Sequence, residues 1–128
     1  NPVSCAVGNA VLDVIDNEKL QNNASLTGNY FIRELNKLKL KFPNFISDIS
    51  GRGLFIGIDL IKKGNPLIPN SILAKNLINH LRHKGILLST DGPYNNVIKI
   101  KPPMVFNKDN VNFVCREISE FLINENKK

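Results

Sequence analysis

The spacing of apolar residues predicts two consecutive helices at the start of the chain. Asn1 before Pro2 is a typical N-cap with proline at the first helical position, so the first helix should begin at once and end near residues 16–17. A second helix should run from about 18 to 40, because Pro43 cannot continue it. The apolar stripes at helical spacing are Val3, Val7, Ala10, Val11 and Val14 in the first helix and Leu20, Ala24, Phe31, Leu35 and Leu38 in the second.

The period of the pattern changes in the middle of the chain. Residues 48–61, DISGRGLFIGIDLI, predict a short strand, a glycine turn and a long apolar strand at the centre of a sheet. Gly64, Pro66 and Pro69 then indicate a loop. A third helix should follow and end at Gly85, with apolar residues at Leu73, Leu77, Ile78 and Leu81.

Two short strands and a last helix are expected in the remainder. Residues 86–89 and 97–100 predict the strands, with the turn cluster DGPYNN between them, and Pro102-Pro103 ends the second strand. Residues 125–128 should fray. Asn107 can cap the last helix, whose inward positions are Val111, Val114, Ile118, Phe121 and Leu122.

This order of elements predicts an α/β (α+β) fold built on one small sheet. The sheet should have three to four strands, mixed or antiparallel, and be covered by helices. Residues 18–124 should form a single domain. Residues 1–17 should form a helix apart from it that docks on something outside this chain.

Length and composition are those of one globular domain. The chain has 128 residues, 42% hydrophobic and 22% charged, so disorder and coiled coil are poor interpretations. No apolar run approaches the ~18 residues of a membrane span, so no membrane partner is expected. The first residues show no initiator Met and neither a secretory nor a transit pattern. We therefore expect a segment of a longer protein that is mitochondrial or cytoplasmic and not secreted.

The net charge of +6 permits binding to phosphate groups, nucleic acid or acidic surfaces without choosing among them. The lysines are dispersed along the chain, which is typical of a solvated surface. Tyr30, Tyr94 and the scattered phenylalanines offer no basic and aromatic stacking platform, so nucleic acid is not an expected partner.

Several short motifs have simple structural explanations. Residues 51–57, GRGLFIG, lack the spacing and the following helix of a nucleotide-binding loop, and indicate a tight turn plus a strand glycine that another backbone approaches closely. His80 and His83 have no third ligand nearby, so two surface histidines and no metal are expected. Cys5 and Cys115 should be buried thiols. No nucleophile lies beside a base, so no catalytic residue is assigned.

The unusual segment is residues 89–103, STDGPYNNVIKIKPP. A strand that carries lysines and exits into Pro102-Pro103 can hold a cation in a fixed direction. Strand alternation sends Lys99 and Lys101 to the same face. The alternatives are an edge strand with solubilising lysines, or a Lys99 that pairs with a structural carboxylate.

Three segments together resemble the C-terminal part of class III pyridoxal-phosphate aminotransferases, which are fold-type I enzymes. They are NPVSCAVGNAVLDVI at residues 1–15, GRGLFIGIDLI at 51–61 and VIKIKPPMVF at 97–106. Within that class, STDGPYNNVIKIKPPM at 89–104 is most similar to the alanine-glyoxylate-aminotransferase-2-like branch. Ethanolamine-phosphate phospho-lyase and phosphohydroxylysine phospho-lyase belong to this branch.

The resemblance implies that residues 18–124 are the small domain of such an enzyme and residues 1–17 a helix of its interdomain region. Pyridoxal 5'-phosphate is then bound by a large domain upstream, which carries the Schiff-base lysine, so no catalytic or cofactor-binding residue is expected in this chain. The implied partners are that large domain, a second subunit and a small phosphorylated amine or amino acid. Lys99 matches the position of an arginine that, in many relatives, handles a substrate carboxylate or pairs with an active-site glutamate. Lys99 and Lys101 are therefore the candidate substrate-binding residues.

Three hypotheses of function follow. The first is a fragment, inactive alone, of a phospho-lyase that eliminates phosphate from a phosphorylated amine such as phosphoethanolamine or phosphohydroxylysine. The second is a fragment of an ω-aminotransferase of the alanine-glyoxylate type. The third is a basic binding module without enzymatic activity.

Overall fold

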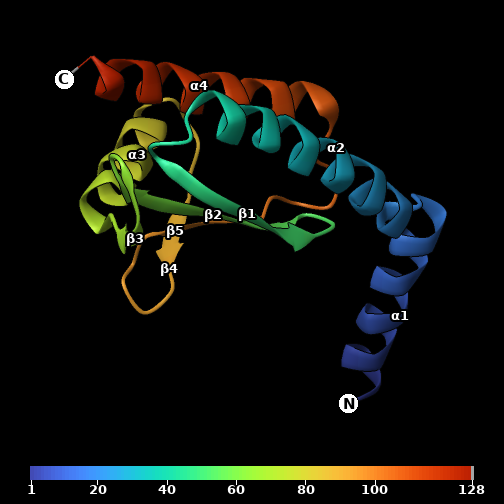
Figure 1. The fold of residues 1–128 in the computed structure, drawn as a ribbon. Helices are drawn as coiled ribbons and strands as arrows, with labels where there is room; N and C mark the ends of the chain where they lie inside the picture. Colours follow the sequence, from blue (N-terminus) through green and yellow to red (C-terminus); the bar gives the residue numbers. More distant parts are fainter. Residues whose placement is uncertain (128) are drawn as a thin grey trace.

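The computed structural model describes residues 1–127, and its ribbon is shown in Figure 1. The described chain contains four helices and five strands, and each predicted helix is present. The elements in order are α1 (Pro2–Asn17), α2 (Leu20–Lys41), β1 (Ile46–Arg52), β2 (Phe55–Lys62), β3 (Asn65–Pro69), α3 (Ser71–His83), β4 (Ser89–Asp91), β5 (Val97–Ile100) and α4 (Lys108–Asn126).

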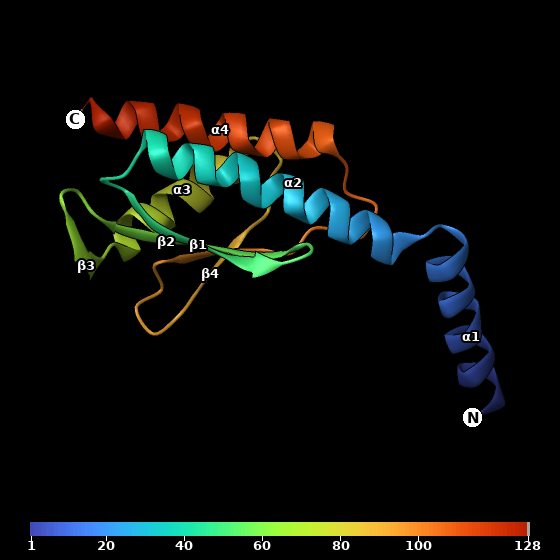
Figure 2. The same ribbon diagram turned by 45° about the vertical axis from the view of Figure 1, so that its right-hand side comes forward.

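The strands form an antiparallel sheet with helices on one face. The strand order is β1-β2-β5-β4, and β3 pairs with β2 beyond this path. α2, α3 and α4 lie over one face, whereas no helix of residues 1–127 covers the other (Figures 1 and 2). The predicted fold class, a small antiparallel sheet covered by helices, is therefore confirmed, but the sheet has five strands instead of the three to four expected.

Alternation along the two central strands explains why the sheet is covered on one side. Ile56, Ile58 and Leu60 of β2 point to the helices and are buried, as are Ile98 and Ile100 of β5. They join one hydrophobic core with residues of the three helices, which include Phe31, Leu35, Leu77, Ile118 and Leu122. The positions between them carry small, polar or charged side chains that face away from the helices.

Two strand boundaries differ from the prediction. Residues 65–69, predicted as a loop, form β3, because prolines are tolerated on an edge strand that bonds to one neighbour only. The strand predicted at 86–89 begins instead at Ser89 and runs to Asp91. Ile86 N–H donates to the Leu81 carbonyl at the end of α3, 2.9 Å away, so this segment closes the helix before the strand ladder begins.

The two ends of the chain differ in how they pack. α4 continues to Asn126, two residues into the segment expected to fray, while Lys128 lies outside the described residues. α1 projects away from the rest of the fold and buries none of its residues (Figures 1 and 2). The prediction that Cys5 is buried is therefore wrong, because the helix that carries it has no neighbour on that face. Cys115 is buried as predicted.

Candidate functional site

The candidate site lies on the uncovered face of the sheet, called the open face here. Its side chains come from alternate positions of four strands, in the opposite register to the buried set. Gly57 of β2 lies opposite both Ser50 of β1 and Lys99 of β5, so one row crosses the three strands. The open face includes Ser50, Arg52, Phe55, Gly57, Asp59, Ser89, Asp91, Val97, Lys99 and the following Lys101.

A hollow of about 570 Å³ lies on this face where Gly57 has no side chain. A Cβ at Gly57 would stand 3.2 Å from Val97 Cγ1 and 3.3 Å from Ser50 Oγ, so any larger residue would fill the space. We call it the Gly57 hollow. Its charged and hydroxyl-bearing lining residues are Ser50, Arg52, Asp91 and Lys99.

Lys99 is tied to the neighbouring strand by an ion pair. Its Nζ lies 2.5 Å from Asp91 Oδ2, and the side chain is half-buried. The Gly92 N–H donates to Asp91 Oδ1 at 2.8 Å, which fixes the carboxylate that holds the lysine. The hydrogen bond from Lys99 and then that from Gly92 lower the pKa of Asp91 below its ordinary value. The pairing of Lys99 with a carboxylate, one of the alternatives considered from the sequence, is thus observed.

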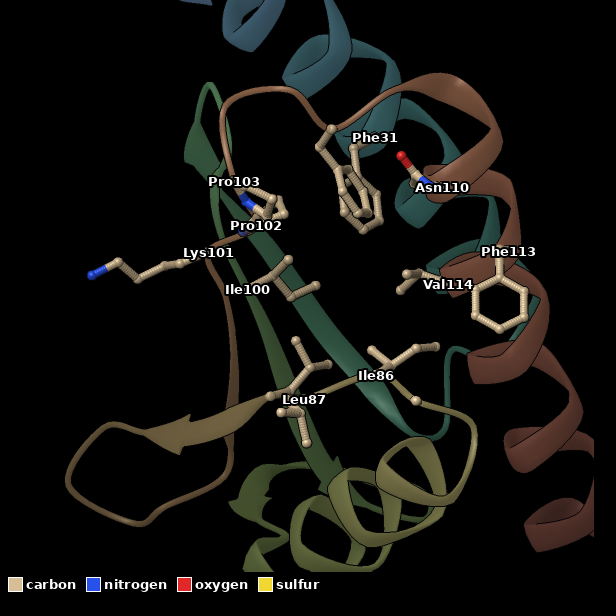
Figure 3. Close-up of a pocket in the computed structure, with 13 residues that line it drawn as sticks. Phe31, Ile86, Leu87, Ile100, Lys101, Pro102, Pro103, Asn110, Phe113 and Val114 are labelled. Atoms are coloured by element: carbon tan, nitrogen blue, oxygen red, sulfur yellow. The ribbon is translucent and has the colours of Figure 1, made fainter. Parts of the chain in front are cut away.

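Lys101 shares the face but not the hollow. Its Nζ lies 5.3 Å from the centre of the Phe55 ring, a cation–π arrangement. Figure 3 shows its side chain extending away from the cluster formed by Pro102, Pro103 and Phe31. The two lysines predicted to share one face therefore have different neighbours, Asp91 for Lys99 and Phe55 for Lys101.

Arg52, like Ser50, lines this site but was not among the candidate residues predicted from the sequence. It ends β1, lies opposite Phe55 and lines the Gly57 hollow. Within residues 1–127 its side chain has no hydrogen-bond or ion-pair partner. The signal was present in the alternation of Ser50 and Arg52, because extending the open-face pattern to the strand before the glycine turn places both beside Gly57.

A second hollow, of about 390 Å³, lies where β5 leaves the sheet and is shown in Figure 3. Its walls are largely apolar, and Phe31 and Phe106 stack there with ring centres 6.0 Å apart. Pro102 and Pro103 form one side, as expected of a rigid exit. No carboxylate lines it.

The described residues do not fit pyridoxal phosphate by themselves. The apolar hollow offers no inward lysine, since Lys101 extends outward (Figure 3), and no acid for the ring nitrogen. In the Gly57 hollow, Lys99 and Asp91 already satisfy each other.

The remaining motifs have structural roles. Gly51 and Gly53 adopt φ of 144° and 56°, the turn predicted for the glycine motif, and the close backbone approach is to Gly28 of α2 rather than at the strand glycine. His83 is exposed, but His80 is not a surface histidine as predicted: its Nε2 is buried, and its ring lies 5.4 Å from that of Phe121.

Residues 1–127 contain no group of three or more side chains that could hold a metal ion. The helices in that range include none with the length and apolar character to cross a bilayer.

Comparison with known proteins assigns the family. Residues 1–122 match the family described as aminotransferase class III, and the chain belongs to this family. This match confirms the resemblance to class III aminotransferases described from the sequence. Members of this family are enzymes that use pyridoxal phosphate.

Two of the similar proteins carry names of the branch indicated by residues 89–104. The chain is 46% identical over 112 residues to an alanine-glyoxylate aminotransferase 2-like protein of Drosophila melanogaster, covering 86% of this chain and 22% of that protein. It is 43% identical over 112 residues to ethanolamine-phosphate phospho-lyase homolog 1 of Caenorhabditis elegans, covering 87% of this chain and 24% of the relative. The chain thus spans about a quarter of the length of these relatives.

The fold is also that of a solved phospholyase. A phospholyase from Arthrobacter, determined in complex with phosphoethanolamine, superimposes with a TM-score of 0.90 at 36% identity. The match covers 96% of this chain and 29% of the phospholyase. The five-stranded sheet and its helices therefore correspond to part of a larger enzyme of the same fold.

Proposed function

We propose that this chain is the small domain of a pyridoxal-phosphate-dependent phospho-lyase that eliminates phosphate from a phosphorylated amine. The observation that carries the proposal is the similarity to the Arthrobacter phospholyase, which was solved with phosphoethanolamine and aligns over almost the whole chain. When bound in the complete enzyme, the cofactor supplies the electron sink for the reaction. The chain alone supplies no catalytic lysine under this proposal.

In this proposal the open face turns towards the reaction site. Lys99 offers a point charge with three donors, which suits a phosphate without requiring the planar two-point geometry of an arginine and a carboxylate. Asp91 holds the Lys99 ammonium over the sheet, so less side-chain entropy is lost when the substrate arrives. Lys101, whose ammonium lies over Phe55, adds positive field without direct contact.

The function is tested on the full-length enzyme that contains this chain. Phosphate release from phosphoethanolamine and from phosphohydroxylysine is followed together with the aldehyde and ammonia produced. We expect stoichiometric phosphate and ammonia from one of the two amines. Absence of phosphate release from both, with the cofactor bound, would refute the lyase proposal.

The role of the lysines is tested by Lys99→Met and Lys101→Met in the same enzyme. A charge-assisted contact is worth ~1.5–3 kcal/mol, so Lys99→Met should lower kcat/KM by roughly 10- to 100-fold, mainly through KM. Because Lys99 is half-buried and paired, we expect the lower end of this range. Lys101→Met should have a clearly smaller effect. Equal and small changes in kcat/KM for both variants would show that both lysines are ordinary solvated residues and that Lys99 does not bind the substrate.

A second candidate function is transfer of an amino group to an oxo acid. It is favoured by the relative named alanine-glyoxylate aminotransferase 2-like, at 46% identity. The two reactions differ in products, because transamination of a non-phosphorylated amino acid yields an oxo acid and consumes a second oxo acid without releasing phosphate. Measuring both products in one assay separates the candidates.

A further inference from the structure

The lining of the Gly57 hollow carries a net positive charge that does not come from Lys99. Lys99 and Asp91 form an ion pair, so their formal charges cancel within the lining. Arg52 is the other cation that lines the hollow, and within residues 1–127 no carboxylate pairs with it. The single net positive charge of the lining therefore comes from Arg52.

We propose that Arg52 is a substrate-binding residue that receives the phosphate group of the substrate in the Gly57 hollow. This inference rests on the proposed function and names the group that binds the anion. The guanidinium presents planar, paired donors that match two phosphate oxygens, which a lysine cannot do. Ser50, whose Oγ borders the space above Gly57, supplies a hydroxyl donor on the same strand.

The fold fixes the place of Arg52. The register of β1 and β2 puts Ser50 opposite Gly57 and Arg52 opposite Phe55, so the arginine lies two positions along the strand from the floor of the hollow. The turn that follows is set by Gly53, which has a φ of 56° and packs directly against Gly28 of α2. An arginine at this position extends from an anchored hairpin end rather than from a free loop.

The surroundings favour a phosphate over a carboxylate as the ligand. The carboxylate of Asp91 already occupies Lys99, and the Gly92 N–H holds that carboxylate in place. A substrate carboxylate would therefore have to compete with an identical group for Lys99. A phosphate monoester carries a charge near −2 at neutral pH and three acceptor oxygens, so it can engage Arg52, Ser50 and a free proton of Lys99 together. The hollow of about 570 Å³ admits such a group because Gly57 leaves the floor empty.

The test uses the full-length enzyme with cofactor bound and three variants. Arg52→Met removes the charge, Arg52→Lys keeps the charge without the paired donors, and Lys62→Met is the control, since Lys62 is an exposed cation at the other end of β2. KM and kcat for phosphoethanolamine are measured, and the dissociation constant of inorganic phosphate is determined by calorimetry.

For Arg52→Met we expect KM and the phosphate dissociation constant to rise about 10-fold with kcat within about 2-fold, since a charged hydrogen bond to a ligand is lost. For Arg52→Lys, KM and the phosphate dissociation constant should lie between the values of the wild type and of Arg52→Met. For Lys62→Met, both should equal the wild-type values. Equal phosphate binding by Arg52→Met and Lys62→Met would overturn the inference. A wild type that releases no phosphate would instead refute the proposed function, while the calorimetric comparison would still decide the role of Arg52.

Discussion

Replacing Gly28 by alanine tests whether the contact between α2 and the β1-β2 turn holds the hairpin end that carries Arg52. Gly28 is buried in α2, and its backbone lies directly against Gly53. A methyl group built there would stand 2.6 Å from Gly53 Cα and closer still to its carbonyl carbon and oxygen. Because all these atoms are backbone, the overlap can be relieved only by moving the helix or the turn.

Two opposing contributions determine how much Gly28→Ala changes the free energy of unfolding. Alanine in place of glycine favours a helix by about 1 kcal/mol. Overpacking a tight contact costs typically ~1–3 kcal/mol, and overlap with main-chain atoms places this site at the upper end. The net loss in free energy of unfolding should therefore be about 2 kcal/mol. For a domain of this size it corresponds to a melting temperature lower by roughly 6–8 °C.

The assay is thermal unfolding of the 128-residue chain, followed by circular dichroism, with Gly8→Ala as the matched control. Gly8 is also helical, but a methyl group there would meet nothing within 4 Å. Gly8→Ala should raise helicity slightly and leave the main transition unchanged. A Gly28→Ala variant that melts at or above the wild-type temperature would refute the argument that the hairpin end depends on this contact.

Three further predictions concern titration and local stability. Removing the Lys99 charge by Lys99→Met should raise the pKa of Asp91 towards its ordinary value in an NMR carboxyl titration, whereas an unchanged titration would contradict the ion pair. Cys5 should react with a thiol reagent at pH 8 at once and Cys115 only after unfolding, because burial raises the pKa of the Cys115 thiol to about 12. The amides of α1 should exchange faster than those of α2, since α1 buries no residue; equal protection in a monomeric sample would be against this.

The helices and central strands could be predicted from the sequence because local patterns determine them. The caps at Asn1 and Asn107 and the stop before Pro43 are where the sequence placed them. β3 was missed because proline and glycine are usually loop residues, and Pro66 and Pro69 join the sheet only at the last residues of β2, beyond its pairing with β5. Pairing with a distant partner is not visible in a local pattern.

The open face was only partly predictable because its charge depends on one strand boundary. Lys99 followed from the resemblance and the alternation of β5, but Asp91 was placed in a turn, where its side chain has no fixed direction. β4 extends to Asp91, and Ser89 faces Lys99, so alternation puts the Asp91 carboxylate on the same face as the lysine. Because the strand ends two residues later than predicted, Lys99 is a paired cation and not a free one. Arg52, on the strand at the other side of Gly57, is then the unpaired charge of the hollow.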